Sequence, residues 1–414
     1  MATAPGKPSI EADVTIVGGG MVGASLALAL GGTGVRVLLI ESVPFDSAQQ
    51  HSFDARTTAL GNASQRIFSA LGIWEEVAGA AQPIRSIHVS EAGRFGFARL
   101  EAREQGIEAF GYVLANRTLG AALWGALQGQ AQLTLRVPAQ VTDIDIGADA
   151  VQLSVASPGG APERVTSRLV VAADGAHSQV RAAAGIESQV EDYGQVAVVT
   201  VVGTDTPHAG RAFERFTRAG PLAVLPLHDG NLAVIWACTP ERAQQLLAVS
   251  DAAYLAQLQA TFGWRAGRFV RAGQRGSYPL QLTRAAAPVA QRTVLIGNAA
   301  QALHPVAGQG FNLGLRDAAM LAELIAAASA DAGDAALLAR FAAWRAGDRA
   351  GVTRFTDSLV KLFGDARPGM GLMRSLGLLM FDLTPPAKAA LARVSAGFTG
   401  PVPRLARGLP VRHV

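Results

Sequence analysis

Three glycines near the N-terminus have the spacing of a loop that binds a phosphate group. Gly18, Gly20 and Gly23 lie in VGGGMVG, between an apolar run typical of a buried strand and an Ala- and Leu-rich run typical of a helix. Gly18 permits a tight turn, Gly20 lets the backbone approach a pyrophosphate, and Gly23 lets the helix pack on the strand. Glu41 ends the next strand-like run, at the spacing where a carboxylate binds an adenosine ribose. These residues predict a dinucleotide-binding βαβ unit, and the alternative is a glycine-rich turn without a ligand.

A second acidic position follows another buried strand. Asp174 and Gly175 come directly after the apolar run RLVVAA, and the carboxyl ends of parallel strands are where such sheets bind ligands. Taken alone, Asp-Gly is an ordinary turn more often than a site.

The glycine motif does not distinguish FAD from NAD(P). No second GxGxxG follows a strand, so one dinucleotide at most has a dedicated binding unit.

The third candidate is the segment VLIGNAAQALHPVAGQGFNLGLRD, residues 294–317. It carries no charge from Gly297 to Leu315 unless His304 is protonated. Gly308, Gly310 and Gly314 would let backbone N–H groups approach a flat, electron-rich group. The helix expected to begin near Asn312 would direct its positive end at the same group. The alternative for this segment is a structural loop.

Composition bounds the class of protein. Half of the 414 residues are hydrophobic and 46 are glycine, which is typical of a large globular core. Cys238 is the only cysteine, so an intramolecular disulfide and a cysteine metal cluster are excluded, and a reducing cytosolic setting is expected. No secretory signal and no metal centre are expected. The uncharged stretch between Asp13 and Arg36 contains seven glycines, which favours strand–glycine–helix over a membrane span.

The order of the patterns predicts the architecture. Strands at 13–19 and 35–41 flank a helix at 21–32, further helices are expected at 64–77 and 116–129, with Asn116 as a cap, and a strand at 167–175. Residues 186–287 alternate as β-strands do, and the α/β pattern returns at Thr293. The prediction is an α/β fold in which a Rossmann-like nucleotide-binding domain (10–78, 112–185 and 288–345) is interrupted by a β-rich substrate domain (79–111 and 186–287). A C-terminal helical region (346–414) follows.

Positive charge gathers at the C-terminus. The chain carries +4 overall, yet from Lys361 onward eight Lys/Arg stand against two Asp. These cations are mixed with Leu, Met and Phe. Two interpretations stay open: helices that pack on the body, or a basic, amphipathic surface for a membrane or partner. Nucleic acid is disfavoured, because aromatic and basic residues are not interleaved.

Taken together, the three motifs resemble the class A flavoprotein aromatic hydroxylases, whose prototype is p-hydroxybenzoate hydroxylase. With DARTTALGNASQRIFSALGIW (54–74), they are most similar to the ubiquinone-biosynthesis hydroxylases, in particular the branch acting on 2-polyprenyl-6-methoxyphenol. The resemblance extends from Val14 to Asp348. It implies FAD as cofactor, NAD(P)H as transient reductant, and a flavin C4a-hydroperoxide formed with O2 that hydroxylates a polyprenylated phenol.

The resemblance also implies roles for individual residues. Those matching the part of the family motif that binds the ADP half of FAD are Gly18, Gly20, Gly23 and Glu41. Arg56 matches an arginine that reaches the cofactor, Arg117 matches a flavin-facing arginine, and Asp174 matches a motif linked to FAD and NADPH. The segment from Pro305 through Gly308 to Asn312 matches the loop along the flavin ring, with Gly310, Phe311 and Asn312 nearest its pyrimidine edge. The Pro305 carbonyl would approach flavin and substrate. His304 is an acid–base candidate, although a structural histidine is at least as good an interpretation.

Asn298 departs from the family pattern, in which most members carry Asp and accept hydrogen bonds from the ribityl chain. An amide oxygen still accepts hydrogen bonds, and the amide adds two donors while removing one negative charge. This Gly-Asn form fits the 6-methoxyphenol branch.

A polyprenylated substrate implies a cytoplasmic protein bound peripherally at the inner membrane, with other ubiquinone-biosynthesis proteins as partners.

Two alternative functions remain open. One is a flavin hydroxylase of another ring position or of a soluble aromatic. The other is a non-catalytic, flavin-bound scaffold.

Overall fold

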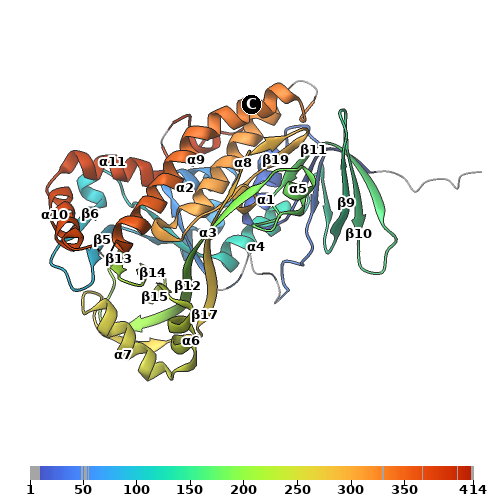
Figure 1. Ribbon diagram of the computed structural model, residues 1–414. Helices are drawn as coiled ribbons and strands as arrows, with labels where there is room; N and C mark the ends of the chain where they lie inside the picture. The colour runs from blue at the N-terminus through green and yellow to red at the C-terminus, as the bar shows by residue number, and fades with distance from the viewer. Residues whose placement is uncertain are drawn as a thin grey trace, which may run out of the picture.

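Two large β-sheets, lying side by side and flanked by helices, form the frame of the protein (Figure 1). The computed structural model describes residues 10–47, 50, 54, 56–328, 331–365, 367–398 and 400–411. One sheet has eight strands, the second has nine, and a third, small sheet has three. The expected α/β fold with a β-rich insertion and C-terminal helices is confirmed.

The eight-stranded sheet has a parallel core in the order β19-β11-β1-β2-β8. Its strands are β1 (Ile10–Val17), β2 (Val37–Ile40), β8 (Leu133–Arg136), β9 (Gln140–Ile146), β10 (Val151–Ala156), β11 (Glu163–Ala172), β18 (Val289–Ala290) and β19 (Thr293–Leu295). All four residues of β2 are buried, as expected for a parallel strand covered on both faces. Helices α1 (Met21–Leu30), α4 (Asn116–Leu127) and α8 (Gln309–Ala327) cover one face. The β9–β10 hairpin and α5 (Gln179–Ala183) cover the other.

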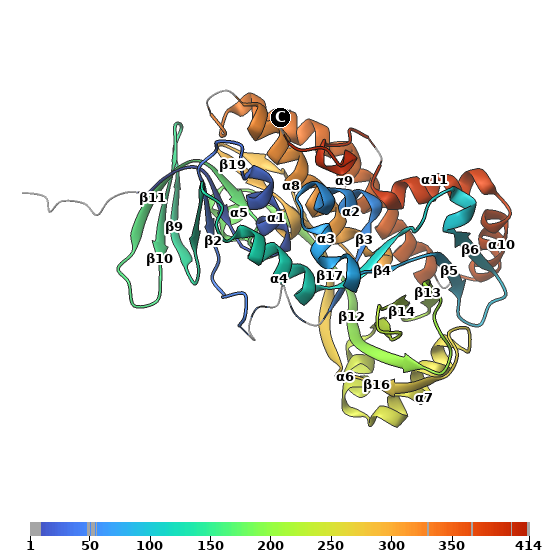
Figure 2. The ribbon, with the colours of Figure 1, turned by 180° about the vertical axis from the view of Figure 1, so that it is seen from behind.

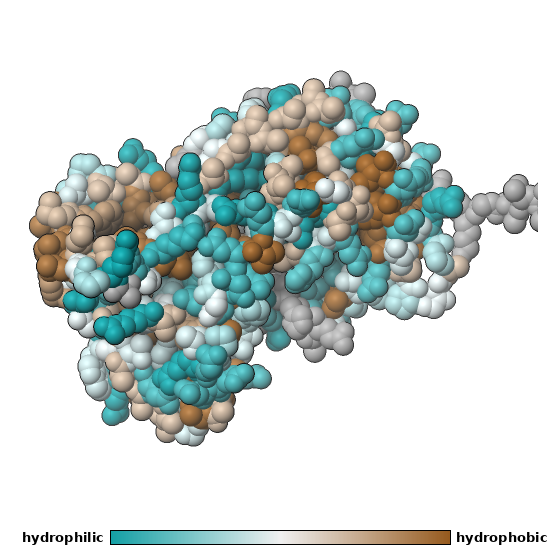
Figure 3. All heavy atoms as spheres, viewed as in Figure 1, coloured by the Kyte–Doolittle hydropathy of each residue, from teal (hydrophilic) through white to brown (hydrophobic). Residues whose placement is uncertain are grey.

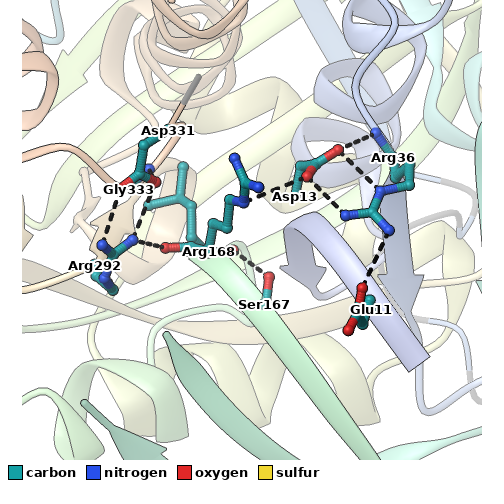
Figure 4. A network of polar contacts seen from close by, with 9 residues as sticks. Glu11, Asp13, Arg36, Ser167, Arg168, Arg292, Asp331 and Gly333 are labelled. Carbon is teal, nitrogen blue, oxygen red and sulfur yellow. Dashed lines mark hydrogen bonds and ion pairs between the residues drawn. The ribbon is translucent and has the colours of Figure 1, made fainter. Parts of the chain in front are cut away.

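Ion pairs lie near the amino ends of the strands in this parallel core (Figure 4). Arg36 binds the Asp13 carboxylate through Nη2 at 3.0 Å and Nε at 3.2 Å. Arg292 binds Asp331 through Nη2 at 2.9 Å. Their partial exposure limits each pair to at most about 1 kcal/mol. The opposite, carboxyl ends of these strands carry the sequence motifs.

The nine-stranded sheet contains most of the strands of the β-rich insertion. Its strands are β5 (Ser86–Glu91), β6 (Phe97–Glu101), β12 (Ser188–Thr204), β13 (Arg211–Thr217), β14 (Gly220–Pro226), β15 (Leu232–Cys238), β16 (Phe269–Ala272), β17 (Gly276–Ala285) and β20 (Gln301–Ala302). Helices α6 (Pro240–Ala248) and α7 (Asp251–Phe262) cover one face. The long strands β12 and β17 extend back toward the first sheet (Figure 2). Residues 186–287 are β-rich, as the sequence predicts, and they also contain helices α6 and α7, which the sequence prediction did not include.

A small sheet and the remaining helices close the structure. They are β3 (Thr57–Gly61), β4 (Gln82–Pro83), β7 (Gly111–Ala115), α2 (Asn62–Ala70), α3 (Trp74–Val77), α9 (Ala335–Gly364), α10 (Met370–Asp382) and α11 (Pro385–Ala396). The helix predicted at 64–77 is two helices, because Gly72 adopts φ +74° between them. Asn116 is the first helical residue of α4 rather than its cap, and its Oδ1 accepts a hydrogen bond from Thr58 Oγ1 at 2.6 Å. Helix α9 runs unbroken through residue 345, the domain boundary expected from sequence.

Buried ion pairs fix α8 against α9. The Asp317 carboxylate, 0% exposed, accepts from Arg345 Nε at 2.7 Å and from Arg349 Nη2 at 2.9 Å. Arg316 binds Asp348 at 2.8 Å in the same way. These contacts hold the helix that begins at the third sequence motif. Across the described residues, the helices fall short of the length and apolarity that crossing a bilayer requires.

Candidate flavin and substrate site

The glycine turn after β1 has the geometry of a nucleotide-binding loop. Gly18 adopts φ +103°, and a Cβ there would lie 2.4 Å from the Ala173 carbonyl oxygen. A Cβ on Gly23 would lie 2.0 Å from the Gly18 carbonyl oxygen, so helix and turn could not pack. Gly20 caps α1 without a side-chain hydrogen bond. The first N–H groups of α1 therefore have no side-chain acceptor at the cap and suit an anion.

Glu41 lies beside this turn. Its carboxylate accepts the Gly19 N–H at 2.6 Å and the Val43 N–H at 2.8 Å. Trp124 of α4 donates its indole N–H to the Gly19 carbonyl at 3.1 Å and holds the turn from the other side. A carboxylate offers about four acceptor positions, so ribose hydroxyls can still bind Glu41.

Asp174 follows β11 and lies next to the same turn. Its Oδ2 accepts the N–H groups of Gln179 at 2.9 Å and Val180 at 3.3 Å, at the start of α5. Its Oδ1 is buried and has no hydrogen-bond partner among the described residues. Burial raises the pKa of the Asp174 carboxyl. A buried acceptor without a partner is costly, so this position fits a polar group of a bound cofactor.

The motif of residues 294–317 forms the loop between β19 and α8. Asn298 lies three residues after β19, in the 3-10 turn Gly297–Ala299, and is exposed. No hydrogen bond joins its side chain to any described residue. A Cβ on Gly310 would meet nothing within 4 Å, so this residue borders open space. Gly308, at φ +59°, caps α8. Gly314 is different, because a Cβ there would lie 2.9 Å from Gly297 Cα. The expectation that Gly314 opens the backbone to a ligand is wrong, since it packs α8 on the preceding turn.

Asn312 ties this loop to the small sheet. Its Oδ1 accepts from Gly61 N at 2.8 Å and Ser64 Oγ at 2.6 Å. Its Nδ2 donates to the carbonyls of Ala59 at 2.8 Å and Gly308 at 2.7 Å. The side chain is thus fully engaged within the protein. Only the backbone of Asn312 is available to a flavin.

His304 belongs to this loop, and its side chain is buried. It is 1% exposed, its Nδ1 accepts the Val306 N–H at 3.2 Å, and its Nε2 lies 3.2 Å from Gln195 Oε1. Burial lowers the pKa of His304 to about 4, so the ring is neutral and Nε2 donates to Gln195. His304 is not among the residues lining the adjacent cavity, which gives no support to an acid–base role. Pro305 does line the cavity, and its carbonyl accepts the Gly308 N–H at 2.9 Å.

The two candidate arginines have different positions. Arg56 lines the cavity, binds Asp54 at 2.7 Å, and holds its guanidinium 5.4 Å from the centre of the Tyr278 ring. Arg117 is exposed on the first turn of α4 and lies outside the cavity wall. Arg56, but not Arg117, therefore lines the same cavity as the loop of residues 305–312.

A large cavity opens at the loop of residues 305–312. Its volume is about 1030 Å³, and it runs between the 305–312 loop, the inner face of the nine-stranded sheet and helices α9, α10 and α11. Most of its wall is aliphatic or aromatic, with Phe216, Leu225 and Ile235 on the sheet and Phe363, Met373 and Phe381 on the helices. This size and composition suit an extended apolar ligand that reaches the loop with one end.

Sequence reasoning missed the acid in this wall. Glu214 lies on β13 between Ala212 and Phe216, and all three line the cavity because alternate residues share a face. Burial raises the pKa of Glu214 to about 8. The sequence RAFERFT did carry a signal, because its acid alternates with apolar residues on one face of the strand. Alternation alone does not show which face of the strand is covered by other elements.

Comparison with known proteins agrees with this geometry. A family model described as "FAD binding domain" matches residues 11–356. The structure of p-nitrophenol 4-monooxygenase PnpA from Pseudomonas putida shares the fold, with a TM-score of 0.77 at 22% identity, covering 95% of this chain and 99% of that one. The chain is an FAD-dependent aromatic hydroxylase, and the glycine turn, Glu41 and the unpartnered Asp174 oxygen fit that cofactor.

Two relatives narrow the class. Ubiquinone hydroxylase UbiL of Rhodospirillum rubrum is 38% identical over 419 residues, covering 99% of this chain and 96% of the relative. The 3-demethoxyubiquinol 3-hydroxylase of Escherichia coli is 33% identical over 375 residues, covering 89% and 94%. The chain belongs to the ubiquinone-biosynthesis hydroxylases.

Proposed function

We propose that the protein hydroxylates the ring of 2-polyprenyl-6-methoxyphenol, using NAD(P)H and O2. The observation that carries this proposal is the apolar cavity that leads from the loop of residues 305–312, here called the flavin loop, to helices with exposed apolar side chains. A ring placed at the loop and a prenyl chain lying along the sheet and helices would fill it. Bound FAD supplies electron transfer from NAD(P)H to O2 and delivery of one oxygen atom to the ring.

The residues of this chain would bind, orient and exclude water. The glycine turn, Glu41 and Asp174 would hold the adenosine and pyrophosphate end. Asn298 would bind the ribityl chain, and the backbone from Gly310 to Asn312 would face the flavin ring. The apolar wall would keep water from the reacting centre.

The ring position rests on Asn298, since the Gly-Asn form fits the 6-methoxyphenol branch. The second candidate is another ring position, which is favoured by the activity that names the Escherichia coli relative, a 3-hydroxylase. Deleting the gene and identifying the accumulated quinone intermediate separates the two. Accumulated 2-polyprenyl-6-methoxyphenol supports the proposal, whereas 3-demethoxyubiquinol or unchanged ubiquinone overturns it. The native gene should restore ubiquinone, and a Gly23→Val variant should not.

We further propose that the protein is cytoplasmic and docks on the inner membrane through α10. Leu372, Met373, Leu376 and Met380 are each at least half exposed, and Figure 3 shows apolar surface at the end of the molecule where α10 lies. Met373 also lines the cavity, so cavity and exposed face meet at this residue. A prenyl chain could therefore enter from the lipid at α10.

The cations near α10 are not the main basis of the proposed docking. Three cations of the C-terminal region are paired within the protein: Arg374 with Glu91 at 2.6 Å, Lys388 with Asp382 at 3.2 Å and Lys361 with Asp357 at 2.9 Å. Paired cations attract anionic lipid weakly. Docking would rest mainly on the apolar face of α10.

Vesicle co-sedimentation of FAD-loaded protein tests this docking. The double variant Leu372→Ser/Met380→Ser should lose most vesicle binding and keep its FAD. Val190→Ser, which changes an exposed apolar residue on β12, is the control. Unchanged partition of the double variant contradicts membrane docking. If the double variant binds vesicles as native protein does but no longer co-purifies with other ubiquinone-biosynthesis proteins, the face binds protein instead.

A further inference from the structure

Glu214 is the acidic side chain in the wall of the cavity. Its strand, β13, lies between β14 and β5, so the residue is inside the nine-stranded sheet rather than at its edge. The neighbouring positions on the same face of those strands are Val89 and Ala223. The accessible part of the carboxyl group therefore opens into the cavity.

The carboxyl group has no partner within the protein. No hydrogen bond or ion pair joins its side chain to any described residue, and burial is the only cause of its raised pKa. The cations that line the same cavity, Arg56 and Arg374, are each engaged with another acid, Asp54 and Glu91. The remaining titratable side chains in the wall are His177 and Tyr278. An acid without a charged partner in such surroundings is uncharged at neutral pH.

Glu214 also lies close to the flavin loop. Phe216, two residues along the same face of β13, packs in one apolar cluster with Val306 of the loop and Phe363 of α9. Phe216 stacks on Phe363 with ring centres 3.6 Å apart. Two residues along a strand span roughly 7 Å. A ring lying against the loop is thus within reach of the carboxyl group.

An uncharged carboxyl group offers one donor and one acceptor side by side. A phenol with a neighbouring methoxy group offers the complementary pair. We propose that Glu214 binds the substrate ring at these two points, accepting the phenol O–H and donating its own O–H to the methoxy oxygen. This inference rests on the proposed function and names the residue that recognises the ring. An acid without a partner in an apolar cavity wall is costly without ligand, and the contact would recover that cost when the ring binds.

Binding to FAD-loaded protein tests the contact without requiring turnover. The ligands are three short-chain rings: 2-prenyl-6-methoxyphenol, 2-prenylphenol, and the dimethyl ether that lacks the hydroxyl. Each lost hydrogen bond should weaken binding to native protein about tenfold. Glu214→Gln keeps one donor and one acceptor and should retain this order within about threefold. Glu214→Leu keeps the volume but has neither group, and should bind all three rings equally.

The pH dependence separates this role from a structural one. Preference for the methoxyphenol should fall as pH rises through about 8 in native protein, because ionised Glu214 has lost its donor. The Gln variant should show no such change. Discrimination by Glu214→Leu equal to that of native protein overturns the inference, as does a Gln variant that behaves like Leu. If the rings bind in the expected order but the deletion strain accumulates a different intermediate, the proposed function fails and the contact stands.

Discussion

The Oδ1 atom of Asn312 accepts a 2.6 Å hydrogen bond from the hydroxyl of Ser64, a residue 248 positions earlier in the chain. This bond joins the first turn of α8 to α2. With the three other hydrogen bonds of the same amide, it fixes the flavin loop on the small sheet through protein contacts alone. The loop therefore presents its backbone in a set geometry, which is how donors can act on a reduced flavin without reorganising.

Asn312→Asp tests this arrangement. The change replaces an N–H₂ group that donates to two carbonyl oxygens with an acceptor facing both, so we expect a loss of about 2–4 kcal/mol in the free energy of unfolding. FAD affinity should fall at least tenfold. Thermal unfolding and FAD titration measure the two effects.

Asn298→Asp is the matched control, since the side chain of Asn298 is exposed and has no described partner. It should leave the unfolding free energy within about 0.5 kcal/mol of native. Equal effects of the two substitutions would mean that Asn312 does not organise the loop.

Asp317→Asn should be the most destabilising single change in the helical layer. Arg345 and Arg349 would lose a fully buried charged partner, which typically costs about 3–5 kcal/mol. Urea unfolding of the FAD-loaded protein gives the value. Asp251→Asn, which breaks an exposed pair with Arg275, should cost less than about 1 kcal/mol. A loss below 1 kcal/mol for Asp317→Asn would show that α8 is held by its apolar contacts alone.

Glu214 should make stability depend on pH. Its folded pKa is about 8, above the ordinary value of 4.5, so the folded state holds a proton that the unfolded state releases. Native protein should thus lose stability as pH rises from about 4.5 to 8, by up to roughly 1.4 kcal/mol per pH unit. Glu214→Gln removes this contribution. The stability of the variant relative to native should grow between pH 5.5 and 8, and a constant difference would place the carboxyl group in water.

Local sequence accounts for the nucleotide-binding end. Gly18 and Glu41 directly follow β1 and β2, Asp174 lies two residues after β11, and Asn298 lies three residues after β19. These four strands are neighbours, and parallel strands bring their carboxyl ends to one edge. The short-range sequence pattern was sufficient to predict these residues, because each acts near the end of the strand that positions it. The two missed helices also had local signals, since Thr239 and Ser250 cap them.

The remaining features depend on contacts between distant segments. Sequence gives no indication that Asn312 meets Ala59 and Ser64, or that Gly314 packs on Gly297 rather than on a ligand. Glu214 was missed for the same reason, because the residues that line the cavity with it come from strands and helices far apart in the chain. Arg117 matched a family position, but the first turn of α4 leaves it exposed outside the cavity.

Oxygen incorporation tests the central claim most directly. FAD-loaded protein, NAD(P)H and short-chain 2-prenyl-6-methoxyphenol should react under ¹⁸O2 to give a ring product carrying one ¹⁸O atom. NAD(P)H consumption should match product one to one. NAD(P)H oxidation without labelled product, or no oxidation above that of protein without substrate, would contradict the account of the protein as the hydroxylase of this ring.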